Sequence, residues 1–138
     1  MINFSVIDIE IPDDFQKERV QGWLKNAIVD EGKILGELNY QFVSDSYLHN
    51  INVDFLDHDT LTDIITFPNV NDYNIVSGDL FISLDRIKEN AIDGDIPFLE
   101  ELHRVIIHGV LHLIGFDDKT KEDIIIMREK ENYYLNNI

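Results

Sequence analysis

Residues 108–118 read His-Gly-Val-Leu-His-Leu-Ile-Gly-Phe-Asp-Asp and close the most regular helical pattern in the sequence. The residues before and within this stretch place apolar side chains at helical spacing, which predicts a helix over residues 98–114 with one face in the core. The apolar positions are Leu99, Leu102, Val105, Ile106, Val110 and Leu113. Gly115 is expected to end the helix, because glycine readily adopts the conformations found at helix C-termini.

His108 and His112 stand four residues apart on this predicted helix. That spacing puts both imidazoles on one face, one turn apart, so that two ring nitrogens can bind one metal ion. Asp118 follows the glycine turn and can supply a third ligand. Because three protein ligands leave one coordination position open, the pattern predicts a catalytic zinc site rather than a structural one.

The same spacing matches the metzincin proteases, in which a helix, a glycine turn and a third ligand follow one another. A zincin protease, however, has its general-base glutamate directly after the first histidine. Gly109 occupies that position here. Proteolysis is therefore disfavoured, and the sequence identifies no general base.

The rest of the chain predicts a mixed sheet of four strands packed with about five helices, in the α+β class. Alternating or continuous apolar patterns predict strands over residues 3–10, 36–43, 62–67 and 75–83. Further helices are predicted over residues 12–30, 45–55, 84–90 and 121–134. Ser83 is expected to cap the helix that follows it, and Thr120 with Asp123 resembles a capping box with a shorter acid for the last helix. Gly78 indicates either a bulge or a close backbone approach. No linker or repeat divides the chain, so residues 1–138 are expected to form one domain.

Composition narrows the class of protein further. Of the 138 residues, 11 are basic and 27 are acidic, so the formal net charge is −16 and the general basic footprint of a nucleic-acid binder is absent. The chain has no cysteine, which excludes disulfides and thiolate metal sites. The N-terminus does not resemble a signal peptide, no apolar run is long enough for a membrane span, and there is no phosphate-binding loop for a nucleotide cofactor. The sequence thus predicts a cytoplasmic protein.

Three motifs in register resemble the YbeY family of endoribonucleases, which are also called rRNA maturation factors. HGVLHLIGFDD resembles the family signature H-G-x-L-H-L-x-G-Y-D-H. Residues 62–68, TDIITFP, resemble the strand T-(D/N)-V-L-S-F-P, and residues 78–83, GDLFIS, resemble G-D-I-x-I-S. The resemblance covers about residues 52–134.

The resemblance implies a zinc-dependent endoribonuclease that prefers single strands. Its implied roles are maturation of the 3′ end of small-subunit ribosomal RNA and ribosome quality control, with RNA and the ribosome or a ribosomal protein as partners. The family's three signature histidines fall on His108, His112 and Asp118. Asp118 departs from the family histidine and would make the metal a weaker Lewis acid, while the adjacent Asp117 competes for the same role.

A second departure concerns an arginine that precedes the T-D strand in the family. Leu56 stands in its place, so a phosphate-binding cation is lost there. Arg86 or Arg104 can replace it, and Arg104 is preferred because it lies one helical turn before His108. An ion pair of Arg104 with Glu100 or Glu101 is an equally good interpretation.

The remaining candidates are weaker. His49, His58 and His103 are not expected to bind the metal. Asp63 and Asp79 lie in apolar strands, where a carboxylate needs hydrogen bonds, and each is either structural or part of the site. Two other functions stay open: a ribosome-assembly factor with a structural or weakly active metal site, and a different zinc metallohydrolase.

Overall fold

The computed structural model describes residues 1–56 and 62–138, and these form four strands and five helices. In chain order they are β1 (Ile2–Val6), α1 (Lys17–Asp30), β2 (Ile34–Val43), α2 (Asp45–Leu56), β3 (Ile64–Pro68), β4 (Ile75–Ser83), α3 (Leu84–Gly94), α4 (Phe98–Ile114) and α5 (Lys121–Leu135). The predicted number of each element and the α+β class are confirmed.

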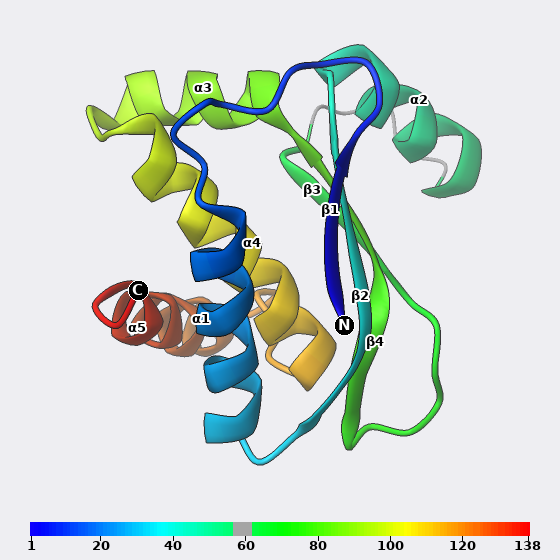
Figure 1. The fold of residues 1–138 in the computed structure, drawn as a ribbon, viewed down its shortest axis with the longest axis vertical. Coiled ribbons are helices and arrows are strands. Elements are labelled where there is room, and N and C mark those ends of the chain that lie inside the picture. The colour runs from blue at the N-terminus through cyan, green and yellow to red at the C-terminus, as the bar shows by residue number, and fades with distance from the viewer. Residues whose placement is uncertain (57–61) are drawn as a thin grey trace.

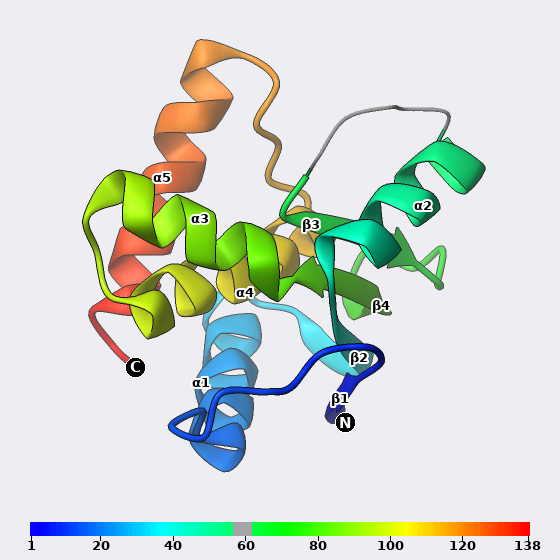
Figure 2. The same ribbon diagram turned by 90° about the horizontal axis from the view of Figure 1, so that it is seen from above.

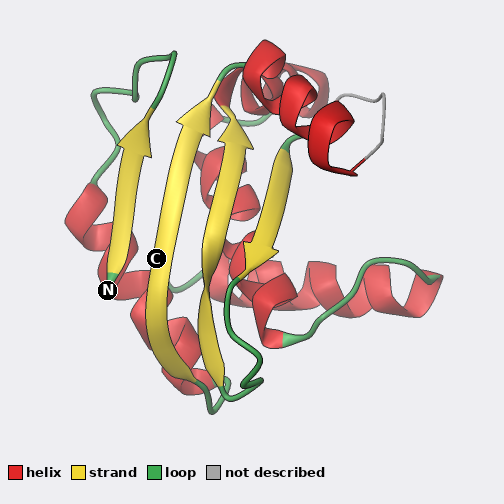
Figure 3. Ribbon diagram, turned by 90° about the vertical axis from the view of Figure 1, so that its right-hand side faces the viewer, coloured by secondary structure: helices red, strands yellow, loops and turns green. Residues whose placement is uncertain are grey.

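The strands form one mixed sheet in the order β1-β2-β4-β3. β1, β2 and β4 run parallel, and β3 pairs antiparallel with β4 at the edge, as Figure 3 shows. The long crossovers between the parallel strands contain helices, as parallel pairing requires. β3 therefore forms one rim of the sheet.

Helices α1, α4 and α5 lie on one side of the sheet, and α2 lies near one end of the other side (Figures 1 and 2). The main core lies between the sheet and these first helices, where Leu38, Tyr40 and Leu80 meet Ile106 and Val110 with no exposed surface. A smaller cluster under α2 joins Leu48 to strand residues of the opposite face. The sheet is therefore covered fully on one face and in part on the other.

Two contacts fix α4 against the sheet. A Cβ atom at Gly109 would lie 2.5 Å from Leu80 Cδ2 and 2.8 Å from Ile64 Cδ1, so any side chain at this position would require these two side chains to shift. The Tyr40 hydroxyl donates a hydrogen bond of 2.8 Å to the carbonyl oxygen of Ile106. α4 consequently packs close to β3 and β4, with the turns that carry His108 and His112 beside the β3 rim.

The predicted close approach at Gly78 is confirmed. A Cβ atom there would lie 2.6 Å from the Phe67 carbonyl oxygen on the neighbouring strand. Because a backbone atom cannot move aside cheaply, any side chain at Gly78 would push β3 away from β4. The glycine thus keeps the β3 rim in place.

The N-terminal predictions need two corrections. The first strand ends at Val6 rather than residue 10, because the chain then bends and Asp8 accepts a hydrogen bond of 2.9 Å from the Ser44 backbone. The first helix begins at Lys17 rather than Pro12. Residues 12–15 form a turn instead, in which the Phe15 N–H donates to the Pro12 carbonyl and the Phe15 ring packs against Phe4.

Both predicted helix caps are confirmed. The Ser83 hydroxyl accepts the Arg86 backbone N–H, and α3 runs on to Gly94, beyond the predicted residue 90. Thr120 and Asp123 form a reciprocal capping box at α5. Within the described part of the chain, no helix has both the length and the apolarity needed to cross a membrane.

Candidate metal centre

α4 presents two histidines at its C-terminal end. His108 and His112 lie one turn apart, and their rings meet edge to face with centroids 4.5 Å apart. Both side chains are only partly exposed, at 20% and 25%. The predicted helical spacing therefore brings two imidazoles together at an accessible position.

The chain turns sharply after α4. Gly115 has a φ of +125°, where side chains rarely fit, and its N–H donates to the carbonyls of Leu111 and His112. This turn returns Asp118 to the two histidines: its Oδ2 lies 3.4 Å from His108 Nε2 and 3.3 Å from His112 Nε2. Among the described residues, the group with metal-binding geometry consists of His108, His112 and Asp118, without Asp117.

The donor set suits a zinc ion. One ligand atom from each of the three residues lies within 4.8 Å of the others. Two atoms bound about 2.0–2.1 Å from a tetrahedral ion lie about 3.4 Å apart, and the two histidine–aspartate distances have this value. The residues present are therefore compatible with a site of two nitrogens and one oxygen.

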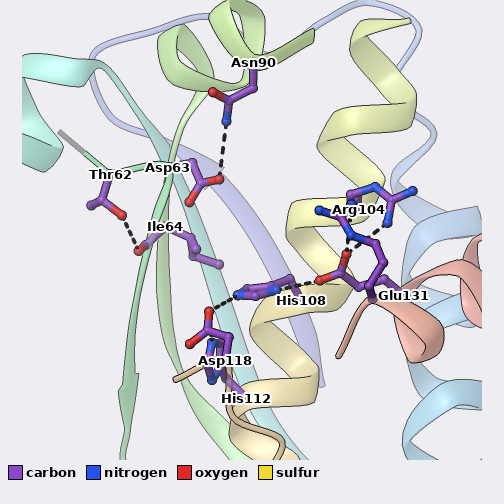
Figure 4. A network of polar contacts seen from close by, with 10 residues as sticks. Thr62, Asp63, Ile64, Asn90, Arg104, His108, His112, Asp118 and Glu131 are labelled. Atoms are coloured by element: carbon purple, nitrogen blue, oxygen red, sulfur yellow. Dashed lines mark hydrogen bonds and ion pairs between the residues drawn. The ribbon is translucent and has the colours of Figure 1, made fainter. Parts of the chain in front are cut away.

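A second carboxylate lies on the other side of His108. Glu131 of α5 places Oε2 2.7 Å from His108 Nδ1, and its Oε1 accepts a hydrogen bond of 2.9 Å from Arg104 (Figure 4). The Glu131 side chain is only 6% exposed. The ion pair of Arg104 is thus with Glu131, not with Glu100 or Glu101 as one interpretation of the sequence expected. Its predicted phosphate contact stays a prediction.

These contacts shift the pKa values of both Glu131 and His108. Burial by itself raises the pKa of Glu131, but the hydrogen bonds from His108 and Arg104 outweigh burial and lower the pKa below its ordinary value. For His108, burial lowers the pKa, while the bond to Glu131 and the nearby acids produce a net rise. The contact between the two groups therefore favours the ionised form of Glu131 and the protonated form of His108.

A cavity of about 260 Å³ opens beside the histidines, between α4, α5 and the start of β3. Asp63 and Glu101 line it, together with apolar side chains that include Val105 and Met127. Burial raises the pKa of both carboxyls above their ordinary values. Asp63 also accepts a hydrogen bond of 3.4 Å from Asn90. This places Asp63, one of the two strand acids noted in the sequence, next to the candidate site.

Asp79, the other strand acid noted in the sequence, lies away from the candidate site. Asp79 accepts a hydrogen bond of 3.1 Å from Asn39, which in turn accepts one from Asn3. These three side chains form a ladder across β1, β2 and β4 on the sheet face opposite α4. Asp79 is therefore a structural acid.

The remaining predicted residues lie elsewhere. The His103 ring packs 5.8 Å from Trp23, away from the other histidines of α4, and His49 belongs to α2. Arg86 pairs with Asp45 at 2.8 Å. His58 and the side chain of Leu56 lie outside the described part of the chain.

Glu131 was not among the site residues predicted from the sequence. Its signal was nevertheless present, because Met127, Glu131 and Tyr134 follow helical spacing and all three are buried. An acid on an otherwise apolar helical stripe requires a polar partner. The sequence did not show which partner, since His108 is 23 residues away and belongs to another helix.

Comparisons with known proteins identify relatives that match nearly the whole chain. A protein-family model described as Endoribonuclease YbeY matches residues 1–138. A protein of that name from Flavobacterium johnsoniae is 47% identical over 135 residues, covering 96% of this chain and 93% of the relative. Another from Flavobacterium psychrophilum is 46% identical, covering 98% and 94%.

A solved structure supports the fold. The solution structure of a Thermotoga maritima protein is similar with a TM-score of 0.71 at 28% sequence identity. The similarity covers 99% of this chain and 87% of that one. The mixed sheet with its helices is therefore shared with a protein of much lower sequence identity than the Flavobacterium relatives.

Proposed function

The chain belongs to the YbeY family of endoribonucleases, and from this membership we propose that it is a zinc-dependent enzyme that cleaves single-stranded ribosomal RNA. The proposed processes are maturation of the 3′ end of small-subunit ribosomal RNA and ribosome quality control. The observation that carries the proposal is the convergence of His108, His112 and Asp118 within 4.8 Å at the end of α4.

The three residues would hold the zinc ion, which when bound supplies a Lewis acid for a phosphoryl oxygen. His108 and His112 contribute nitrogen donors from one rigid helix face, and Asp118 contributes an oxygen from the turn. All three side chains are partly exposed, so an RNA phosphate can reach the site.

The position after the first histidine favours this function over proteolysis. In zincin proteases a glutamate at that position is the general base. Gly109 carries no side chain, and a Cβ atom there would lie 2.5 Å from Leu80 Cδ2 and 2.8 Å from Ile64 Cδ1 of the sheet. The chain therefore lacks the general base of the zincin proteases at this position.

The charge of the chain bears on how RNA is bound. A net charge of −16 opposes tight unaided binding of a polyanion. We therefore propose that the ribosome or a ribosomal protein presents the RNA to the site in the cytoplasm.

The proposal is tested by cleavage of a single-stranded RNA by untagged protein. Cleavage should stop with a chelator, return when zinc is restored, and be absent from His112→Ala under all conditions, because that variant lacks one of three ligands. Equal cleavage by both proteins indicates a contaminating nuclease and contradicts the proposal. No cleavage by either favours a binding role in ribosome assembly.

A matched pair of variants tests the third ligand. Asp118→Asn removes the carboxylate that faces both histidines, whereas Asp117→Asn removes its exposed neighbour and the same formal charge. Cleavage should be lost in Asp118→Asn and kept in Asp117→Asn. The reverse result would assign the ligand to Asp117.

A further inference from the structure

His108 is held on both sides of its ring. Nδ1 lies 2.7 Å from Glu131 Oε2, and Nε2 lies 3.4 Å from Asp118 Oδ2. Figure 4 shows the imidazole between the two carboxylates, with Glu131 coming from α5 and Asp118 from the turn after α4. Because Nε2 faces the other candidate ligand atoms, Nδ1 is not needed to bind the metal and can bond to Glu131 instead.

We propose that Glu131 is a positioning residue of the metal centre, which fixes the tautomer and orientation of His108, and that Arg104 holds the Glu131 carboxylate in place. The inference rests on the proposed function, because it gives the pair a role only if His108 binds a metal. It assigns Arg104 to the support of the site instead of to an RNA phosphate.

The tautomer follows from the donors and acceptors. An ionised carboxylate can only accept hydrogen bonds, and a neutral imidazole carries a single N–H. At 2.7 Å from Glu131 that hydrogen therefore sits on Nδ1, and the lone pair of Nε2 points towards Asp118 and His112. Carboxylates that bind the far nitrogen of a ligating histidine act in this way in metal sites generally.

Arg104 completes the arrangement from the same helix. His108 takes one carboxylate oxygen and the Arg104 guanidinium takes the other at 2.9 Å. Each oxygen thus has a hydrogen-bond donor, and the carboxylate cannot rotate without losing a charge-assisted bond. The exposed Arg128 guanidinium lies farther away, 3.6 Å from the oxygen that Arg104 binds. Arg104 and His108 lie one turn apart on α4, so both donors move with the helix that carries the ligands.

Glu131→Gln is a sharp test because an amide has only one acceptor oxygen. If that oxygen faces His108, the amide nitrogen opposes Arg104. If it faces Arg104, the amide donates to Nδ1 and favours the tautomer whose hydrogen blocks Nε2. Either arrangement weakens metal binding, and loss of such a partner typically costs about 10–100-fold in metal affinity.

The measurement is zinc affinity by competition with a chromophoric chelator, which needs no RNA. Glu131→Gln should bind zinc about 10–100-fold more weakly than wild type, whereas Glu101→Gln should match wild type. Glu101 is the matched control because it lines the same cavity from the first turn of α4. Glu131→Asp, which keeps the charge and both acceptors, should bind more tightly than Glu131→Gln.

The outcomes separate the inference from the proposed function. Wild-type affinity in Glu131→Gln would overturn the inference, while failure of wild type to bind zinc would overturn the proposed function. If Glu131→Gln does not fold, nitrogen NMR of zinc-loaded wild type still decides. A hydrogen on His108 Nδ1 supports the inference, and a zinc bond from Nδ1 contradicts it.

Discussion

Arg86 and Arg104 were the two arginines that the sequence offered for an RNA phosphate, and each binds a carboxylate of this chain instead. Arg86 lies 2.8 Å from Asp45 and Arg104 lies 2.9 Å from Glu131. Each pair joins two helices, α2 with α3 and α4 with α5, and the paired residues are 41 and 27 positions apart in the sequence. Their bond lengths are almost the same, but their surroundings are not.

The carboxylates differ most. Asp45 is 25% exposed, and its second oxygen accepts the Ser83 hydroxyl that caps α3. Glu131 is 6% exposed, and its second oxygen faces His108 of the candidate metal centre. The first pair therefore stabilises a helix junction near solvent, whereas the second connects a buried charge to a candidate metal ligand. The atoms around a pair, more than its length, determine what the pair does.

The largest expected difference between the two pairs is in stability. Glu131→Ala leaves Arg104 and His108 without their acceptor in a buried place and should cost about 3 kcal/mol of unfolding free energy. Asp45→Ala leaves Arg86, whose side chain is 26% exposed, without its acceptor, and the buried Ser83 hydroxyl keeps its bond from the Arg86 backbone, so the change should cost about 1 kcal/mol. Urea unfolding of the metal-free proteins measures both values. Equal losses would mean that burial does not distinguish the pairs.

The same contrast explains why some residues of the candidate site could be predicted from the sequence and Glu131 could not. The spacing of His108 and His112, the Gly115 turn and Asp118 all lie within eleven residues, so local geometry was enough to assemble them. Glu131 reaches His108 only through the packing of α5 on α4, which no local pattern contains. The apolar stripe through Met127 and Tyr134 could have indicated that this acid needs a partner, but it could not have identified the partner.

The predictions of the fold likewise succeeded where the signal was local and failed where a contact joins distant parts of the chain. Ile75–Ser83, α4 and the capping box of α5 were predicted correctly because glycine, apolar spacing and capping residues act locally. The start of α1 was wrong because Pro12-Asp13-Asp14 looks like a capping signal, while the Phe15 ring is held against Phe4 and Phe42 of the sheet. That contact joins distant parts of the chain and outweighs the local preference.

A smaller difference between the two pairs is expected in how strongly zinc stabilises the folded protein. Each arginine is replaced by methionine for this comparison. At a zinc concentration of 100 times the wild-type dissociation constant, binding should stabilise wild type and Arg86→Met by about 2.7 kcal/mol. A tenfold loss of affinity in Arg104→Met would reduce this to about 1.4 kcal/mol. Thermal unfolding with zinc and with chelator gives the difference. Full zinc stabilisation of Arg104→Met would show that Glu131 holds His108 without Arg104, with Arg128 Nη1 still 3.6 Å from the Glu131 carboxylate.

The smallest expected difference is in the response to salt. Raising the salt concentration from about 0.1 M to about 1 M shortens the Debye length from about 10 Å to about 3 Å, and this screens exposed charges much more than buried ones. Arg86→Met should therefore cost a few tenths of a kcal/mol less in high salt than in low salt. The cost of Arg104→Met should stay the same, because Glu131 is nearly inaccessible. Salt changes that affect the whole fold cancel when each variant is compared with wild type in the same buffer.

A salt-sensitive cost for Arg104→Met would mean that water and ions reach the Glu131 carboxylate. The contrast in surroundings between the two pairs would then be smaller than their exposures indicate.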